Sequence, residues 1–186
     1  MKLILASTSP RRIELLKNAG FSFDIISPTC DEELDANLNP SKKVENLSFL
    51  KAKSVFDLNT DSIVIGADTV VALDNEILGK PKDTLDAIKT LSRLNGKTHF
   101  VITGFTVISK DKVITKSVVS KVKFKNLTKK EIENYAKNYN LLDKAGSYAI
   151  QDGVVVEGFE GSYSNIVGLP MESLEEILKD VYYGRR

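Results

Sequence analysis

Near its N-terminus the chain reads Leu3-Ile4-Leu5-Ala6-Ser7-Thr8-Ser9-Pro10-Arg11-Arg12. The first four of these residues form an apolar run of strand length, and Ser9-Pro10 is typical of a helix N-cap followed by a first-turn proline. The stretch therefore predicts a strand that runs directly into the start of a helix. Unpaired N–H groups at that helix start, beside the hydroxyls of Ser7 and Ser9 and two guanidiniums, favour a phosphate site. A serine that only caps the helix beside two solvated arginines is the alternative, and this stretch alone leaves both open.

Outside this stretch the composition is that of an ordinary globular protein. The chain has 186 residues, of which 42% are hydrophobic and 27% are charged. No linker rich in proline, glycine or serine divides it, so we expect a single domain over residues 1–186.

Charge and hydropathy exclude two classes of partner. The formal net charge is +1, so the strongly basic character of a nucleic-acid-binding protein is missing and we expect no nucleic-acid partner. The apolar run after Lys2 is too short for a signal peptide, and no later segment is long enough to span a bilayer. These observations predict a cytoplasmic protein with no membrane partner.

The chain contains one cysteine, Cys30, and one histidine, His99. This excludes an internal disulfide and a cysteine-rich zinc site, and it argues against a multi-histidine metal site. We interpret His99 as structural, since catalytic and metal-binding histidines usually come with a partner that orients them. Any chemistry is expected to use carboxylates, lysines, arginines and a hard metal ion.

Two charged residues interrupt otherwise apolar patterns. Lys51 lies in the middle of the apolar stripe of a helix predicted over residues 39–58, where it must either extend to solvent or meet an anion. Asp68 lies between the apolar runs 62–66 and 70–73, where a predicted strand ends. It either has a partner such as a cation or caps its own turn.

Two further polar features are ambiguous. The acidic segment 27–40, which contains Glu32, is either a solvated loop or a metal-binding loop. Residues 142–151 are interpreted as a charged turn that enters a strand, and this strand is expected to end at Gln151. Its amide could pair with the edge of a nucleobase, although a lone glutamine is commonly a surface residue.

The remaining periodicities and turn signals predict an alternation of helices and strands. Besides the strand at 3–6, the expected elements are a helix over 11–19, a strand over 21–26, a hairpin turn at 74–75, a helix from 83 to 95, strands over 98–108 and 113–124, a helix opened by a capping box at 128–131, a polar loop over 161–170 and a last helix over 171–181.

Eight segments in the same order along the chain resemble those of the Maf family, and they cover nearly all of it. They are Ser7-Thr8-Ser9-Pro10-Arg11-Arg12 with 14–16, 31–32, Lys51-Ala52, Gly66-Ala67-Asp68-Thr69-Val70-Val71, Gly79-Lys80-Pro81, 98–99 with 103–104, 143–151 and 161–170. The resemblance implies an α/β fold, Maf/ITPase-like, in which an elongated mixed β-sheet with flanking helices forms two lobes around a central cleft. It also implies a homodimer, the assembly that members of the family often form.

The activity implied by the resemblance is that of a nucleoside triphosphate pyrophosphatase. Such an enzyme uses a divalent metal, Mg²⁺ or Mn²⁺, to cleave between the α and β phosphates. Maf proteins are also associated with division arrest and with removal of non-standard nucleotides. A nucleotide-binding regulator of septum formation without significant turnover is the alternative, and release of pyrophosphate separates the two.

The resemblance also implies roles for individual residues. Asp68 matches the catalytic proton acceptor, and Arg12, Thr69 and Gln151 match positions of substrate choice in the subgroup that acts on dTTP and UTP. Three other residues match polar positions in the cleft of the family, namely Glu32, Lys51 and Lys80. Ala149 and Asp152 depart from the family, which more often has glycine at both positions.

The residue patterns and the resemblance together give one hypothesis for the site. Phosphate groups would be held by Ser7, Ser9, Arg11, Arg12, Lys51 and Lys80. The metal would be held by Glu32 and Asp68.

Overall fold

Seven strands form one mixed sheet in the part of the chain that this computed structural model describes, residues 1–30, 38–74 and 76–183. In chain order they are β1 (Leu3–Ala6), β2 (Asp24–Ile25), β3 (Ile63–Leu73), β4 (Glu76–Leu78), β5 (Thr98–Ile108), β6 (Val113–Phe124) and β7 (Val156–Glu160). The spatial order is β2-β1-β3-β5-β6-β7, and β4 pairs with β3. Only β1 makes parallel pairs among these strands, with β2 and with β3. The expected mixed α/β class is confirmed.

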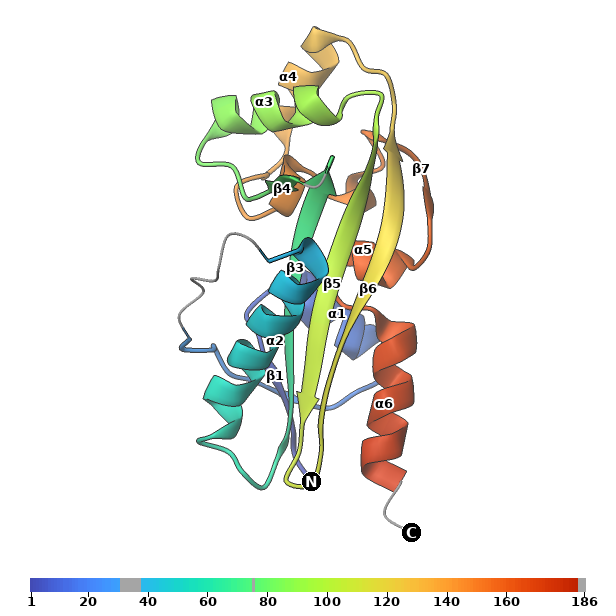
Figure 1. Cartoon of the computed structure of the whole chain (residues 1–186). Helices are drawn as coiled ribbons and strands as arrows, with labels where there is room; N and C mark the ends of the chain where they lie inside the picture. Colours follow the sequence, from blue (N-terminus) through green and yellow to red (C-terminus); the bar gives the residue numbers. More distant parts are fainter. Residues whose placement is uncertain (31–37, 75, 184–186) are drawn as a thin grey trace.

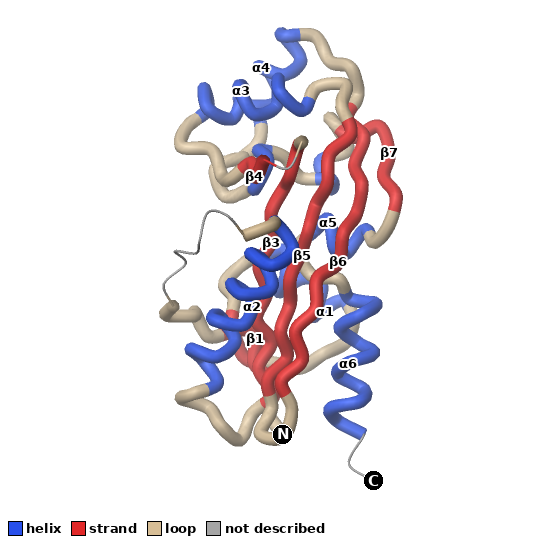
Figure 2. The backbone as a smooth tube through the Cα atoms, viewed as in Figure 1, coloured by secondary structure: helices blue, strands red, loops and turns tan. Residues whose placement is uncertain are grey.

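Helices cover both faces and one end of this sheet (Figures 1 and 2). They are α1 (Pro10–Asn18), α2 (Pro40–Phe56), α3 (Thr84–Leu94), α4 (Lys129–Asn138), α5 (Tyr163–Val167) and α6 (Met171–Tyr183), with two short 3-10 helices, η1 (Ala145–Ser147) and η2 (Ile150–Asp152). α3 and α4 lie at the end of the elongated molecule opposite to the N-terminus and to the last turn of α6 (Figure 1). None of the described helices combines the length and apolar character that a membrane span requires.

β1 is apolar at every position because it is buried on both faces. Leu5 belongs to a hydrophobic cluster with α1 and α6, whereas Ile4 belongs to a cluster with α2 on the opposite face. A separate and larger cluster joins α3 and α4 to the far ends of β3, β5 and β6. β1 therefore contributes to two clusters, one on each face of the sheet, and it does not reach the third cluster at the far end.

Most predicted elements are confirmed within two residues at their ends. The antiparallel pairing of Leu73 with Glu76 confirms the hairpin, although Asn75 itself lies outside the described residues. The strand expected over 21–26 is limited to β2, because only Asp24 and Ile25 pair with β1.

Our expectation that the strand ends at Asp68 is wrong. β3 continues through Asp68 to Leu73, since Asp68 pairs with Gly104 of β5 and the pairing with β5 extends to Ala72. Partners across the sheet override the low strand propensity of aspartate.

Two other segments also differ from the prediction. Residues 142–151 form η1 and the start of η2 instead of a strand, since Gly146 and Ser147 adopt φ values of +69° and +62°, outside the range of a regular strand. The polar loop over 161–170 contains helix α5, whose N-cap Ser162 accepts a hydrogen bond from the Asn165 N–H at 3.0 Å. The preceding strand β7 was not predicted.

Candidate active site

A cavity of about 650 Å³ opens where β1 ends and α1 begins. All of the predicted site residues except Glu32 contribute to its wall: Ser7, Ser9, Arg11, Arg12, Lys51, Asp68, Thr69, Lys80 and Gln151. Glu32 lies outside the described residues. Because β1 stops at Ala6 while β3 continues, the edge of β3 near Asp68 is left beside the start of α1. The fold thus gathers side chains from distant segments around one opening.

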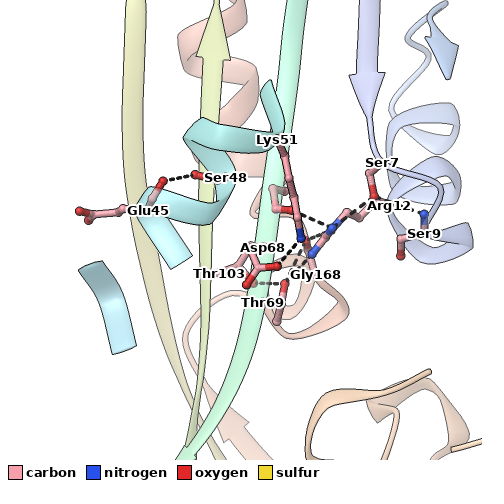
Figure 3. Close-up of polar contacts among 11 residues, drawn as sticks. Ser7, Ser9, Arg12, Glu45, Ser48, Lys51, Asp68, Thr69, Thr103 and Gly168 are labelled. Carbon is pink, nitrogen blue, oxygen red and sulfur yellow. Dashed lines mark hydrogen bonds and ion pairs between the residues drawn. The ribbon is translucent and has the colours of Figure 1, made fainter. Parts of the chain in front are cut away.

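Lys51 and Asp68 form an ion pair inside this cavity (Figure 3). Lys51 Nζ lies 2.7 Å from Asp68 Oδ1, and the two side chains are only 10% and 15% exposed. The apolar stripe of α2 packs against the sheet and carries Lys51 into the site. Lys51 therefore meets an anion, one of the two alternatives that its position in the sequence left open.

The guanidinium of Arg12 binds four residues from three segments of the chain (Figure 3). Its Nε donates to the Gly168 carbonyl at 2.8 Å, and its Nη1 donates to the Ala67 carbonyl at 2.9 Å and to Ser7 Oγ at 3.2 Å. Its Nη2 donates to Thr69 Oγ1 at 3.1 Å. Most of its N–H groups are thus used to organise the wall of the cavity, so Arg12 is first of all a structural centre of the site.

The hydroxyl of Thr69 continues this network into the core. Thr103, which is fully buried, donates its hydroxyl proton to the Asn165 carbonyl at 2.9 Å. Thr69 Oγ1 and Thr103 Oγ1 lie 2.9 Å apart. Because the Thr103 proton is directed at Asn165, Thr69 is the donor in this hydrogen bond, and its oxygen accepts from Arg12. The orientation of the Thr69 hydroxyl is set by these partners. The resemblance included Thr103 and Asn165 but assigned neither of them a role.

Arg11 and Asp143 form the rim of the cavity. Arg11 donates from Nη1 to Asp143 Oδ2 at 2.7 Å and from Nη2 to the Asp143 carbonyl at 3.2 Å. Partial burial by itself would raise the pKa of Asp143, but hydrogen bonds from Lys144 and Arg11 outweigh it and lower the pKa to about 2. Asp143 consequently stays charged at neutral pH. Sequence reasoning did not identify it as the partner of Arg11, because the two residues are 132 positions apart.

The N-terminus of α1 also faces this opening, since Ser9, Pro10 and Arg11 belong to the wall. Ser9 takes the predicted N-cap position, but its hydroxyl makes no capping hydrogen bond to any described residue. Its backbone N–H instead donates to Ser7 Oγ at 3.2 Å. The positive end of the helix dipole is thus directed at the cavity.

Comparison with known proteins agrees with the resemblance seen in the sequence. The Maf-like protein family matches residues 2–181. This chain belongs to the Maf family. It is 50% identical over 182 residues to a dTTP/UTP pyrophosphatase of Thermosipho africanus, covering 97% of this chain and 93% of that protein. It is 46% identical to a protein of the same name from Clostridioides difficile, covering 99% of this chain and 100% of the other.

The fold of this Maf protein is also that of a more distant protein. The structure of the Ham1 protein of Staphylococcus aureus aligns over 100% of both chains with a TM-score of 0.59 and 12% identity. At that identity the likeness concerns the fold alone. It supports the Maf/ITPase-like architecture predicted for the chain.

A divalent metal in this Maf site would have few protein ligands among the described residues. No group of three or more histidine, cysteine, aspartate or glutamate side chains comes together in that part of the chain. Mg²⁺, however, commonly binds through one or two carboxylates together with phosphate oxygens and water. Asp68 fits such a site as one carboxylate ligand, and Glu32 stays a prediction.

His99 lies behind the cavity wall in the larger core. It is fully buried, its Nε2 lies 2.8 Å from the Tyr148 hydroxyl, and its ring stacks edge-on against Phe124 at 4.9 Å. The structural role predicted for His99 is consistent with this position, and the structure supplies the partner that the sequence did not indicate. Burial lowers its pKa to about 4.

We expect this burial to make the fold less stable in mild acid. An unfolded chain binds a proton at histidine near pH 6.5, whereas folded His99 does so only near pH 4. As the pH falls from 7 to 5, the free energy of unfolding should drop by about 2 kcal/mol from this group, and above pH 7 its contribution should be constant. Urea unfolding of wild type and His99→Gln at both pH values measures the difference. An equal pH dependence in the two proteins would contradict the assignment.

Proposed function

We propose that this Maf protein hydrolyses dTTP and UTP to the nucleoside monophosphate and pyrophosphate. Relatives that are 43–50% identical over nearly their full lengths are named dTTP/UTP pyrophosphatases. The observation that carries the proposal is the Lys51–Asp68 ion pair, which lies in a cavity shared with Arg11, Arg12 and Lys80.

The cationic side chains suit a triphosphate tail. A nucleoside triphosphate brings about four negative charges, and hydrolysis moves more charge onto the leaving pyrophosphate. Lys51 and Lys80 approach the opening from different segments, and the N-terminus of α1 adds backbone N–H groups. Cations placed around the departing phosphates would stabilise the transition state more than the ground state.

Asp68 is proposed to position the attacking water and to take its proton as the bond between the α and β phosphates breaks. Lys51 holds Oδ1 at 2.7 Å, so the carboxylate is kept in one orientation on β3. When bound, Mg²⁺ or Mn²⁺ would neutralise phosphate charge and act as a Lewis acid. Asp68 is the proposed ligand among the described residues, with Glu32 as the predicted second one.

Base selection is proposed to involve Thr69, Gln151 and Arg12. Thr69 of β3 and Gln151 of η2 both line the cavity. The Gln151 amide offers both a donor and an acceptor, which suits the edge of a uracil or thymine ring. Arg12 would act by holding Thr69 in place, in addition to any contact with substrate.

A panel of nucleoside triphosphates with pyrophosphate detection tests this function. We expect dTTP and UTP to be turned over at least about tenfold faster than purine nucleotides, with a corresponding ratio in kcat/KM. EDTA should abolish turnover, and added Mg²⁺ or Mn²⁺ should restore it. Tight binding of dTTP without pyrophosphate release would favour the nucleotide-sensing regulator instead. A homodimer, a cytoplasmic location and a link to cell division stay predictions.

A further inference from the structure

Residues 148–151 form one wall of the cavity, and this wall carries Gln151. It belongs to the irregular segment that contains η1 and η2. Two consecutive residues there, Gly146 and Ser147, have positive φ values, and Ser147 is not glycine. A backbone of this kind persists only where surrounding groups hold it in place.

Tyr135 of α4 supplies such a hold from outside the segment. Its hydroxyl donates to Asp152 Oδ2 at 2.5 Å and accepts from the Ala149 N–H at 3.2 Å. These two partners lie on either side of Ile150 and Gln151. The Tyr135 side chain is 2% exposed and belongs to the larger core, and it does not contribute to the cavity wall.

Asp152 is the charged one of the two partners of the Tyr135 hydroxyl. The carboxylate of Asp152 provides a charged acceptor for the phenol, and such hydrogen bonds are roughly twice as strong as neutral ones. Within the turn itself, the Asp152 N–H donates to the Ala149 carbonyl at 3.3 Å and the Gly153 N–H donates to the Ile150 carbonyl at 3.2 Å.

We propose that Tyr135 is a positioning residue for nucleobase selection, acting through the bridge that its hydroxyl makes between Ala149 and Asp152. The bridge fixes the turn that carries Gln151, so that the amide meets the base from one direction. Uracil and thymine present a ring N–H between two carbonyls, whereas cytosine presents a ring nitrogen beside an amino group. In one fixed orientation the amide oxygen accepts from the ring N–H of uracil or thymine while the amide NH2 donates to a carbonyl. The same orientation sets acceptor against acceptor and donor against donor on cytosine, so it favours dTTP over dCTP. This inference rests on the proposed function and deepens it.

Tyr135→Phe tests the proposal, with Tyr139→Phe as the matched control. Tyr139 stands on the next turn from Tyr135 with ring centroids 4.7 Å apart, and its side chain is 39% exposed. For Tyr135→Phe we expect KM for dTTP to rise about tenfold, kcat to change less than about threefold, and the kcat/KM ratio of dTTP to dCTP to fall about five- to tenfold. Tyr139→Phe should keep the wild-type ratio.

Two further variants separate positioning from a general loss of structure. If Tyr135 acts through Gln151, then Tyr135→Phe should have little further effect on the dTTP to dCTP ratio in a Gln151→Ala background. Asp152→Asn keeps an acceptor for the phenol and should lose less selectivity than Asp152→Ala. If Tyr135→Phe does not fold, the comparison of Asp152→Asn with Asp152→Ala tests the same proposal.

The outcomes are distinct from those of the proposed function. A wild-type protein that releases no pyrophosphate from any nucleotide overturns the function. An active wild type, together with folded Tyr135→Phe and Asp152→Ala variants whose dTTP to dCTP ratio stays within about twofold of wild type, overturns the role of Tyr135 alone. Additive effects of Tyr135→Phe and Gln151→Ala would also overturn it.

Discussion

Asp68→Asn should reduce kcat for dTTP by at least about a hundredfold, since loss of one well-placed catalytic group typically costs that much. Asparagine has nearly the same shape and keeps an acceptor for Lys51, but it cannot take a proton from water. KM should change far less than kcat, because Lys51, Lys80 and Arg11 are still present to hold the phosphates. Steady-state pyrophosphate release at saturating dTTP measures the effect.

Asp57→Asn is the matched control for this substitution. Like Asp68, Asp57 forms an ion pair with a lysine of α2, and its Oδ1 lies 2.8 Å from Lys53 Nζ. This pair lies on the surface, where both side chains are about half exposed. Exposed pairs of this type contribute little to stability, so Asp57→Asn should keep kcat within about twofold of wild type. Turnover of dTTP by Asp68→Asn within a few-fold of wild type would show that Asp68 is not the catalytic carboxylate.

Gly66→Ala should destabilise the protein by about 3 kcal/mol or more, at the upper end of what overpacking costs. A β-carbon on Gly66 would lie 2.6 Å from the Ala52 backbone nitrogen and closer still to the Ser48 carbonyl oxygen. Helix α2 thus rests directly on the backbone of β3. Because α2 also carries Lys51, any shift that relieves the clash moves the ammonium relative to Asp68. Thermal unfolding should show a decrease in Tm of at least about 6 °C.

A second glycine serves as the control for backbone effects alone. Gly158 lies in β7, and a β-carbon there would meet nothing within 4 Å. Gly158→Ala should therefore leave Tm within about 2 °C of wild type. If Gly66→Ala were as stable as Gly158→Ala, α2 could retreat from the sheet at no cost, and the close approach would not be what positions Lys51.

Local patterns predicted much of this fold because they depend on neighbours along the chain. The capping box of α4 is present, with the Glu131 N–H donating to Thr128 Oγ1 and Glu131 accepting from the Thr128 N–H. The long pair β5 and β6 has the predicted bounds. The anomalous lysine of α2 was also visible in the sequence, since Lys51 interrupts an apolar stripe and Lys53 does not.

Tertiary contacts decided the parts that the local patterns could not. Asp68 continues a strand because β5 lies beside it, and Gly146 with Ser147 turns a segment that otherwise resembles a strand. The short helix α5 depends on Ser162 as its cap, in a stretch with the composition of a loop.

By itself the sequence determined the periodicity of the main helices and strands, the family, and the residue types available for chemistry. Only the tertiary structure decided which of those residues meet. Arg12 reaches Thr69 over 57 positions and Gly168 over 156, and Tyr135 joins both sides of the turn that bears Gln151. The reason is physical: helix and strand patterns arise from interactions between near neighbours, whereas an active site is made by packing, which brings together residues whose separation along the chain carries no local signal.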